Sequence, residues 1–341
     1  MINVGIAGVG FMGWIHWLAY KKVAGIRVAG ISSRDPKRRA GDWRDIRGNF
    51  GPPGQQVDLS GVKAVDRLDA LLADPAIDLV DLCLPPNLHA EATIQALSAG
   101  KHVFVEKPMA LSAEDCDRMV SAARKSGKQL FVGHVLPFFP EYAEARRIIA
   151  EGRHGRLLGG WFKRVISDPT WLKDFYDLAK VGGPLLDLHV HDAHLIRLLF
   201  GMPTSVTSQG RMRGEAVEYC QTMFGFPDRR LVVGAASGVI NQQGRAFTHG
   251  FEIHLEKATL QYEFAVVGGE GRLILPLTVY EADGGVRRPE LGDGDPVHAF
   301  EGQFAEVVRS IESGRPSAIL SGDLARDAVV LCQMQADAVR R

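Results

Sequence analysis

Two polar residues in a histidine-rich segment have the spacing needed to pass a proton. The segment Gly182–His194 reads GGPLLDLHVHDAH and contains Asp187 and His191, which are i and i+4 neighbours if the segment is helical. The carboxylate would then orient the imidazole ring and favour its charged form, so His191 is a candidate general acid and base near neutral pH. Such a pair could take up the proton that an alcohol releases on oxidation. The structural alternative is a polar helix start that Asp187 caps, with solvated histidines.

A metal centre is another hypothesis for the same segment. Its letters HVHDAH resemble the HxHxDH zinc motif of metallo-hydrolases, although the aspartate comes one place early. The candidate ligands would be His189, His191, Asp192 and His194. No partner cluster occurs upstream, so the sequence favours a site without metal.

A lysine at the end of an apolar strand is the second candidate for chemistry. The segment His102–Pro108, HVFVEKP, places Glu106 and Lys107 at the carboxyl end of a predicted buried strand. In open parallel sheets ligands bind beyond the carboxyl ends of the strands, so Lys107 is directed toward such a site. Its ammonium group could hold a substrate hydroxyl and stabilise alkoxide character as hydride leaves the carbon. A solvated lysine at a strand end is the alternative.

A glycine-rich turn near the N-terminus predicts a dinucleotide site. The letters GVGFMG run from Gly8 to Gly13, between a predicted strand and a predicted helix. The first glycine allows a sharp turn, Gly10 lets the backbone approach a pyrophosphate, and the last lets the helix pack closely on the strand. The pyrophosphate would lie at the helix N-terminus, where unpaired N–H groups and the helix dipole favour negative charge. We therefore predict that Gly8, Gly10, Phe11, Met12 and Gly13 bind the cofactor.

Further cofactor contacts are predicted at two other strand ends. The segment Pro85–His89, PPNLH, follows a strand, and Asn87 suits either a helix cap or a contact with the nicotinamide half. The second strand ends in Ser33 and Arg34, where an acidic residue would bind the ribose hydroxyl of NAD, and Asp35 comes two places late. A hydroxyl and a guanidinium suit a 2′-phosphate, so the cofactor is NADP or NAD, with NADP favoured. The predicted contacts in these segments and in the lysine segment are Ser33, Arg34, Pro85, Asn87, His89, Glu106 and Lys107.

The elements that position these residues alternate between strand and helix in the first part of the chain. This alternation is typical of βαβ units and a parallel sheet. The predicted strands are Asn3–Ala7, Arg27–Ser32, Leu79–Leu84, His102–Glu106 and Gln129–Val132, and the predicted helices are Phe11–Val23, Leu88–Ala99 and Ser112–Ser126. The Gly- and Pro-rich segment Arg47–Ser60 is predicted to be a surface loop.

After about Gly133 the pattern changes to neighbouring strands, which favour an antiparallel or mixed sheet. The predicted strands are Ser205–Gln209, Ala216–Phe226, Arg230–Val239, Phe251–Leu255 and Thr259–Phe264, and the predicted helices are Pro140–Glu151, His191–Leu199, His298–Ser313 and Asp323–Arg340. We therefore predict an α/β protein. Residues 1–130 would form a Rossmann domain with a doubly wound parallel sheet, and residues 131–341 a substrate-binding and oligomerisation α/β domain with a large, mostly antiparallel open sheet.

Composition restricts the partners. Forty Lys and Arg residues balance forty Asp and Glu residues, so bulk charge favours neither a nucleic acid nor a membrane surface as partner. The four cysteines form no CxxC pair, which argues against a disulfide framework and a cysteine-rich zinc site. The first residues already read as a strand, and no apolar run reaches the roughly 18 residues of a membrane span. We expect a cytoplasmic protein with a small-molecule substrate.

The motifs together resemble the glucose-fructose oxidoreductase/inositol dehydrogenase family, Gfo/Idh/MocA. The resemblance rests on GVGFMG, PPNLH, EKP at Glu106–Pro108, GH at Gly133–His134 and GGPLLDLHVH at Gly182–His191. It implies NAD(P)-dependent hydride transfer at a secondary hydroxyl or ketone of a sugar, cyclitol or related polyol. It also implies homo-oligomers, dimers or tetramers, formed through the C-terminal sheet, and an active site in the cleft between the domains. The implied catalytic residues are Lys107, Asp187 and His191, and the implied substrate contacts are these three with His134 and Trp171.

The chain departs from the family pattern near the predicted active site. Pro184 replaces the third glycine of a GGG, and His189 replaces a small residue. His194 stands where an aspartate is frequent, and Pro137 where an arginine is frequent. These changes leave the shape of the pocket, and with it the sugar, open.

Two other functions fit the same motifs. One is a glycoside-cleaving enzyme in which a tightly held NAD transiently oxidises the sugar. The other is a nucleotide-binding sensor without catalysis, against which the presence of Lys107, Asp187 and His191 argues.

Overall fold

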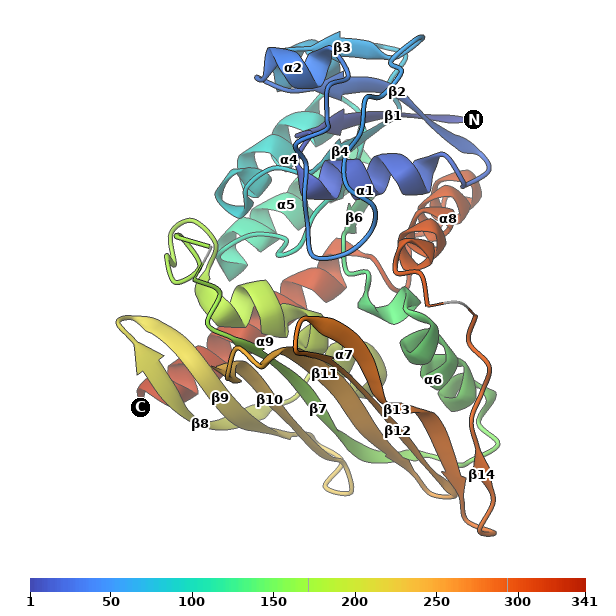
Figure 1. Ribbon diagram of the computed structural model, residues 1–341, viewed down its shortest axis with the longest axis vertical. Coiled ribbons are helices and arrows are strands. Elements are labelled where there is room, and N and C mark those ends of the chain that lie inside the picture. The colour runs from blue at the N-terminus through green and yellow to red at the C-terminus, as the bar shows by residue number, and fades with distance from the viewer. Residues whose placement is uncertain (171, 293) are drawn as a thin grey trace. The chain divides into compact units, whose positions relative to one another are not determined.

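A computed structural model describes residues 1–170, 172–292 and 294–341 of the chain. These residues form two compact units, drawn in Figure 1. The first unit comprises Met1–Phe139 and Gly294–Arg326, and the second comprises Pro140–Asp293 and Asp327–Arg341. The contacts thus group Gly294–Arg326 with the first unit. The expected boundary at residue 130 stays a prediction.

The first unit is built on a six-stranded parallel sheet. Its order is β3 (Lys63–Val65), β2 (Ile26–Ser32), β1 (Ile2–Ala7), β4 (Leu79–Leu82), β5 (His102–Val105) and β6 (Leu130–Val132). Every neighbouring pair is parallel, so all carboxyl ends share one edge of the sheet. The strand order reverses between β1 and β4, which makes this the switch point where dinucleotides bind in such sheets. The predicted Rossmann fold is confirmed.

Helices cover this sheet. They are α1 (Phe11–Tyr20), α2 (Pro36–Arg39), α3 (Leu68–Leu72), α4 (His89–Ser98), α5 (Ala113–Ser126) and α8 (Val297–Ser313), with single turns η1 (Pro86–Leu88) and η2 (Leu136–Phe138). The start and end of α5 follow from its sequence. The Ser112 hydroxyl accepts the Asp115 N–H at 3.1 Å, and Gly127 ends the helix with φ of +67°.

The loop at Arg47–Ser60 is partly buried, whereas we expected a surface loop. Val57 within it is buried, and the Pro52 carbonyl accepts a hydrogen bond of 2.8 Å from the indole N–H of Trp14. Trp14 itself packs edge-on against Trp43. The loop therefore completes the core beside α1, which the count of glycines and prolines did not indicate.

The second unit contains an eight-stranded sheet. Its order is β14 (Val286–Arg287), β13 (Glu270–Glu281), β12 (Ala258–Val267), β11 (Arg245–Leu255), β7 (Leu157–Ser167), β10 (Val232–Asn241), β9 (Ala216–Gly225) and β8 (Ser205–Arg213). Strands β7 and β10 are parallel, and the other neighbours are antiparallel. The expected large, mostly antiparallel sheet is confirmed. Strand β7, which lies inside it, was not predicted.

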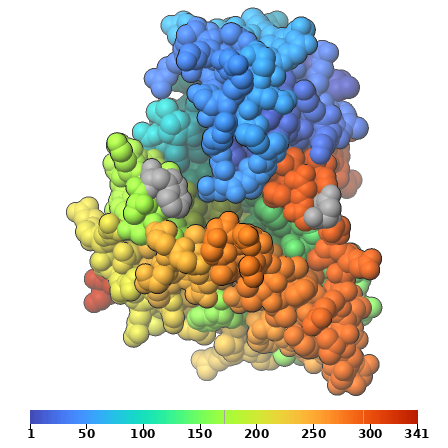
Figure 2. All heavy atoms as spheres, viewed as in Figure 1, coloured from blue at the N-terminus to red at the C-terminus, as the bar shows by residue number. Residues whose placement is uncertain are grey.

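One face of this sheet is covered by helices of the same unit. They are α6 (Pro140–Glu151), the π-turn η3 (Leu185–His189), α7 (Val190–Phe200) and the main part of α9 (Gly322–Arg340). Tyr142 of α6 packs on Phe251 of β11, with ring centroids 5.0 Å apart. Gln335 of α9 donates a hydrogen bond of 2.9 Å to the Thr222 hydroxyl of β9. Strands β11 to β13, gold to orange in Figure 2, form a large part of the surface of this unit in that view.

No helix within the described ranges has both the length and the apolar character that crossing a bilayer requires.

Candidate active site

The glycine turn has the geometry that phosphate binding needs. Gly8 has a φ of +99°, and a Cβ there would lie 2.3 Å from the carbonyl oxygen of Cys83. A Cβ on Gly13 would lie 2.3 Å from the carbonyl oxygen of Gly8, so the helix packs against the turn only without a side chain. A Cβ on Gly10 would meet no atom within 4 Å, because this glycine faces open space. The turn at Gly8 and the close packing at Gly13 are as expected, and the open space at Gly10 leaves room for a cofactor.

The start of α1 is open to an anion. Gly10 is the N-cap, its backbone is extended, and no side chain of the described residues caps it. The first N–H groups of α1 are thus available to a pyrophosphate, and the helix dipole favours its charge. Met12 is half-buried in this first turn, and the ring of Phe11 packs edge-on against Phe50 at 4.9 Å. The structure of this turn fits a dinucleotide cofactor.

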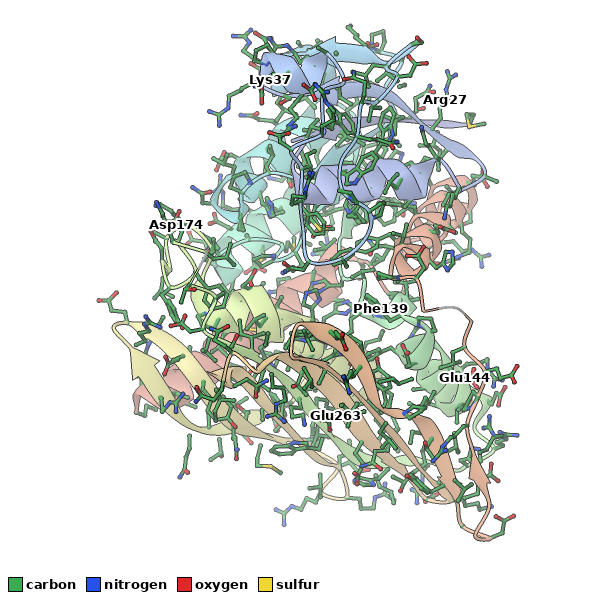
Figure 3. All side chains as sticks on the ribbon, viewed as in Figure 1. Arg27, Lys37, Phe139, Glu144, Asp174 and Glu263 are labelled. Carbon is green, nitrogen blue, oxygen red and sulfur yellow. The ribbon has the colours of Figure 1, made fainter. Side chains whose placement is uncertain are left out.

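The segment after β2 carries several basic side chains, of which Arg34 and Lys37 are exposed. Arg39 donates to the carbonyl oxygens of Ser33 and Arg34 at 2.7 and 2.9 Å, so its charge shapes the turn. Asp35 accepts the N–H of Lys37, a residue labelled in Figure 3, at 2.8 Å as the N-cap of α2. The Arg34 side chain is exposed. One oxygen of the Asp35 carboxylate is therefore engaged with the start of α2.

The ends of β4 and β5 carry the other predicted contacts. Pro85 and Asn87 are exposed before α4. Of the two roles considered for Asn87, the structure does not show the cap of α4, because Asn87 lies within η1 and Leu88 is the N-cap. His89 is fully buried, with Nδ1 2.8 Å from the Pro108 carbonyl oxygen and Nε2 2.8 Å from that of Leu84. Its ring lies inside the fold between the two strand ends.

Lys107 and Glu106 have different environments. Lys107 is half-buried and is joined to Pro108 by a cis peptide bond. Glu106 is buried, and its Oε2 accepts the backbone N–H of Lys107 at 3.2 Å. Its Oε1 lies 3.0 Å from Nε2 of His16 on α1. Glu106 therefore faces the interior of the first unit.

Lys107 shares a sheet edge with the glycine turn. Strand β1 ends before Gly8, β4 ends before Cys83, and β5 ends before Glu106. These three strands are neighbours and parallel. The predicted phosphate, nicotinamide and lysine positions thus follow the carboxyl ends of consecutive strands of one sheet, where ligands of such folds bind.

Asp187 and His191 lie in consecutive turns of different type. Asp187 is in the π-turn η3, and His191 is the second residue of α7. Both are half-buried. Single π-turns at the start of helices are frequent at functional sites, and this one was not predicted. The four residues from Asp187 to His191 therefore include part of a π-turn, which is wider than the α-helical turn that the i and i+4 spacing assumed.

The histidines that flank His191 face the interior. His189 and His194 are fully buried. Burial lowers the pKa of His189, although Asp192 opposes the shift, so this ring favours its neutral form. Within the described part of the chain, no set of three metal-ligand atoms is gathered from His189, His191, Asp192 and His194, so the geometry does not support the metal hypothesis.

Asp192, considered above as a metal ligand, is paired with an arginine that the sequence did not indicate. Arg164 of β7 donates to both of its carboxylate oxygens, at 2.8 Å from Nε and 3.2 Å from Nη2. Both residues are buried. The bidentate pair ties α7 to the sheet at the residue directly after His191.

Two predicted substrate contacts remain. His134 is buried after β6, next to Gly133. A Cβ on Gly133 would lie 2.6 Å from Oε1 of Glu106, so this glycine leaves room for the carboxylate. Trp171 lies outside the described residues.

Comparison with known proteins places the chain in a family. An oxidoreductase family with an NAD-binding Rossmann fold, GFO_IDH_MocA, matches residues 2–134, and a GFO/IDH/MocA C-terminal domain matches residues 142–261. The chain belongs to the Gfo/Idh/MocA oxidoreductases. The resemblance deduced from the motifs is confirmed, as is the prediction of an oxidoreductase that binds a nicotinamide cofactor, while the preference for NADP stays a prediction.

Individual relatives cover most of the chain. The 1,5-anhydro-D-fructose reductase of Ensifer adhaerens is 32% identical over 272 residues, which are 75% of this chain and 76% of that protein. The myo-inositol 2-dehydrogenase of Thermotoga maritima is 26% identical over 97% of this chain and 94% of its own length. A solved levoglucosan dehydrogenase, in complex with NADH and levoglucosan, aligns with a TM-score of 0.79 over 99% of this chain and 97% of its own. Its identity is 22%, so it supports the fold.

Proposed function

We propose that this protein transfers hydride between a nicotinamide cofactor and a secondary hydroxyl or ketone of a sugar, cyclitol or related polyol. The observation that carries the proposal is the position of Lys107, which follows the carboxyl end of β5 in the same parallel sheet as the glycine turn after β1. Named relatives reduce or oxidise an anhydro sugar and inositol, which supports this substrate class.

The residues of the first unit would bind the cofactor and hold the reacting oxygen. The N–H groups of α1 would bind the pyrophosphate, and Pro85 and Asn87 would contact the nicotinamide half. When bound, the nicotinamide accepts or supplies the hydride. The Lys107 ammonium would donate to the substrate oxygen, which stabilises negative charge on it as the hydroxyl carbon loses hydride.

The residues of the second unit would move the proton. His191 would take the hydroxyl proton during oxidation and return it during reduction. Asp187 would orient the ring and favour its protonated form after the transfer. His134 and Trp171 would add contacts to the substrate hydroxyls. In this proposal Lys107, Asp187 and His191 act on one substrate.

The first test is a screen for the substrate. A cofactor at a hundred times its dissociation constant stabilises a protein by about 2.7 kcal/mol, so a rise of several degrees in the unfolding temperature identifies NAD or NADP as ligand. A panel of polyols, cyclitols and keto-sugars is then followed by nicotinamide absorbance. Turnover with any member supports the proposal. Binding of a cofactor without turnover on any member favours the sensor, whereas product without net reduced cofactor favours the glycoside-cleaving reaction.

We further propose that NADP is the preferred cofactor. Support comes from the exposed Arg34, the hydroxyl of Ser33, and the engagement of Asp35 with α2. A guanidinium and a hydroxyl can bind the 2′-phosphate through charge-assisted hydrogen bonds. The ratio of kcat/KM for NADP to that for NAD, measured with one substrate, tests this preference.

We also propose that the protein is a cytoplasmic homo-oligomer that assembles through the sheet of the second unit. The register puts Trp161, Gly234 and Met223 side by side on β7, β10 and β9, and both large side chains are more than a third exposed. Glu263 of β12, labelled in Figure 3, pairs with Lys163 of β7 at 3.0 Å across β11, the strand between them. An exposed tryptophan next to methionine is typical of a protein interface. The four cysteines are free thiols, which suits a reducing compartment.

A further inference from the structure

We propose that two buried histidines, His16 and His89, position Lys107 by holding the residues on either side of it. The inference rests on the proposed role of Lys107 in binding the substrate oxygen. Both histidines belong to the first unit, as does the lysine. They are positioning residues, because their contacts are with protein atoms.

His89 holds the residue after the lysine. Its Nδ1 lies 2.8 Å from the carbonyl oxygen of Pro108, and its Nε2 lies 2.8 Å from that of Leu84. The ring therefore lies within hydrogen-bond distance of both segments, the one that follows β4 and the one that follows β5. A neutral ring carries one N–H and donates to one carbonyl at a time, whereas a protonated ring donates to both. Burial lowers the pKa of His89, so the ring near neutral pH supplies one of the two bonds.

His16 holds the residue before the lysine. Its Nε2 lies 3.0 Å from Oε1 of Glu106, and its Nδ1 is bonded to Oδ2 of Asp81 at 2.8 Å. The other oxygen of Glu106 accepts the backbone N–H of Lys107 at 3.2 Å. A continuous series of contacts therefore runs from Asp81 in β4, through His16 in α1, to the backbone of the lysine.

The environment of His16 fixes its ring. Phe104, Phe300 and Phe304 surround it, with ring centroids 5.5, 5.7 and 4.9 Å from that of His16. The ring is fully buried. Because close-packed aromatic side chains leave little room for another rotamer, the imidazole keeps its Nδ1 bonded to Asp81 and its Nε2 close to Glu106.

The charges around His16 favour its protonated form. Burial alone lowers its pKa, but Asp81 offsets this effect, and the pKa of His16 lies well above its ordinary value. The other titratable groups that face it are Glu106, Cys83 and Tyr20. Burial raises the pKa of the Cys83 thiol and of the Tyr20 phenol, so both stay neutral. His16 thus carries positive charge between two carboxylates.

These contacts matter because lysine has a long, flexible side chain. Its ammonium can hold an oxygen only if the backbone from which it extends is fixed, and a displacement of about 1 Å can reduce turnover by about 100-fold. The segment Glu106–Pro108 is fixed at both ends, once through a side chain and once through a carbonyl oxygen. Gly133 gives the Glu106 carboxylate its room.

The test compares His89→Leu, which removes both ring nitrogens, with His89→Gln, which can still donate to one carbonyl. We expect kcat to fall about tenfold or more in His89→Leu, with KM for the cofactor within about threefold, and to recover partly in His89→Gln. The matched control is His102→Gln. His102 lies at the amino end of the same strand β5 and accepts the Gln129 N–H at 3.1 Å, so its replacement should leave kcat unchanged. Equal kcat in wild type and His89→Leu would overturn the proposal.

Glu106→Gln and His16→Gln test the contacts that hold the residue before the lysine, and both replace a polar side chain by one of similar size. We expect both to lower kcat more than they raise KM for the cofactor.

The charge on His16 gives a second measurement. Because its pKa is raised in the folded state, its stabilisation is complete below about pH 6.5 and is lost as pH rises through the higher folded value. The unfolding midpoint of His16→Gln should therefore lack a decline with rising pH that wild type shows, and parallel curves would contradict the role of this charge.

A measurement that does not depend on turnover separates this inference from the proposed function. The rate at which acetic anhydride modifies Lys107, read by peptide mass spectrometry, reports the exposure of its ammonium group. We expect this rate to change in folded His89→Leu and Glu106→Gln but not in His102→Gln. If Lys107→Ala keeps full turnover, the proposed function is wrong, while the labelling rates still decide the positioning. Unchanged labelling in all variants would overturn the positioning even if Lys107 proves catalytic.

Discussion

Loss of one partner of the buried pair of Arg164 and Asp192 should destabilise the second unit strongly and should displace His191. The two side chains meet through bonds of 2.8 and 3.2 Å, and both are almost completely excluded from solvent. Removal of one partner leaves the other charge buried and unpaired, which costs about 3–5 kcal/mol. Arg164→Met and Asp192→Asn should each lower stability by about this amount. In a unit of this size that corresponds to about 10 °C in unfolding temperature.

The double variant separates pairing from packing. Arg164→Met with Asp192→Leu leaves no unpaired charge, so it should be more stable than either single variant. The assay is a double-mutant cycle in guanidinium chloride, in which the transition of the second unit is followed by itself because two units need not unfold together. The matched control is the exposed pair of Arg230 and Asp228, 2.7 Å apart in the same unit. That pair should show little or no coupling.

Two results would refute this reasoning. Single variants that lose less than about 1 kcal/mol would show that the buried charges are not paired as described. A double variant whose loss equals the sum of the single losses would show that the two side chains do not interact. The folded single variants should also lose kcat more than cofactor affinity, since α7 carries His191 one residue before Asp192.

Three further predictions concern the cofactor and the assembly. Gly8→Ala should abolish cofactor binding, because a Cβ would lie 2.3 Å from a carbonyl oxygen at a φ of +99°. Gly10→Ala should fold normally, because Gly10 faces open space, and should only lose affinity for the cofactor. Equal affinities of the two variants in titration calorimetry would contradict the roles of these glycines. Arg34→Ala should raise KM for NADP about 5- to 30-fold and leave KM for NAD within about twofold, and an equal change for both cofactors would rule out a contact with the 2′-phosphate. Trp161→Glu should shift the mass measured by light scattering toward that of the monomer. The control is Leu172→Glu, which places a charge on another exposed apolar position of the same unit and should leave the mass unchanged. An unchanged mass for Trp161→Glu would exclude the sheet face as the interface.

The part of the fold that local sequence determines could be predicted. The glycine turn, the strand ends at Lys107 and the helix start at Ser112 each depend on a few neighbouring residues. Strand β7 could not be recognised, because Gly159 and Gly160 weaken its strand pattern. Yet a Cβ on Gly159 would lie 1.9 Å from the Val232 carbonyl oxygen, so the close approach of β10 requires this glycine.

The buried charges near the candidate active site could not be predicted either, because their partners are distant in sequence. Arg164 and Asp192 are 28 residues apart, and His16 and Asp81 are 65 apart. One signal was available, since Asp81 stands within an apolar strand and a charged residue there needs a partner. The widened turn at Asp187 depends on packing inside the second unit, which the i and i+4 spacing does not reveal.

In the proposed reaction Lys107 and His191 act on the substrate after the cofactor has bound. The most direct measurement is the single-turnover rate of nicotinamide reduction by wild type, Lys107→Ala and His191→Ala on the best polyol, with cofactor affinity measured in parallel. We predict that both variants bind the cofactor within about threefold of wild type and that the rate falls about 100-fold or more in each. Rates close to that of wild type in both variants, with normal cofactor affinity, would contradict the account.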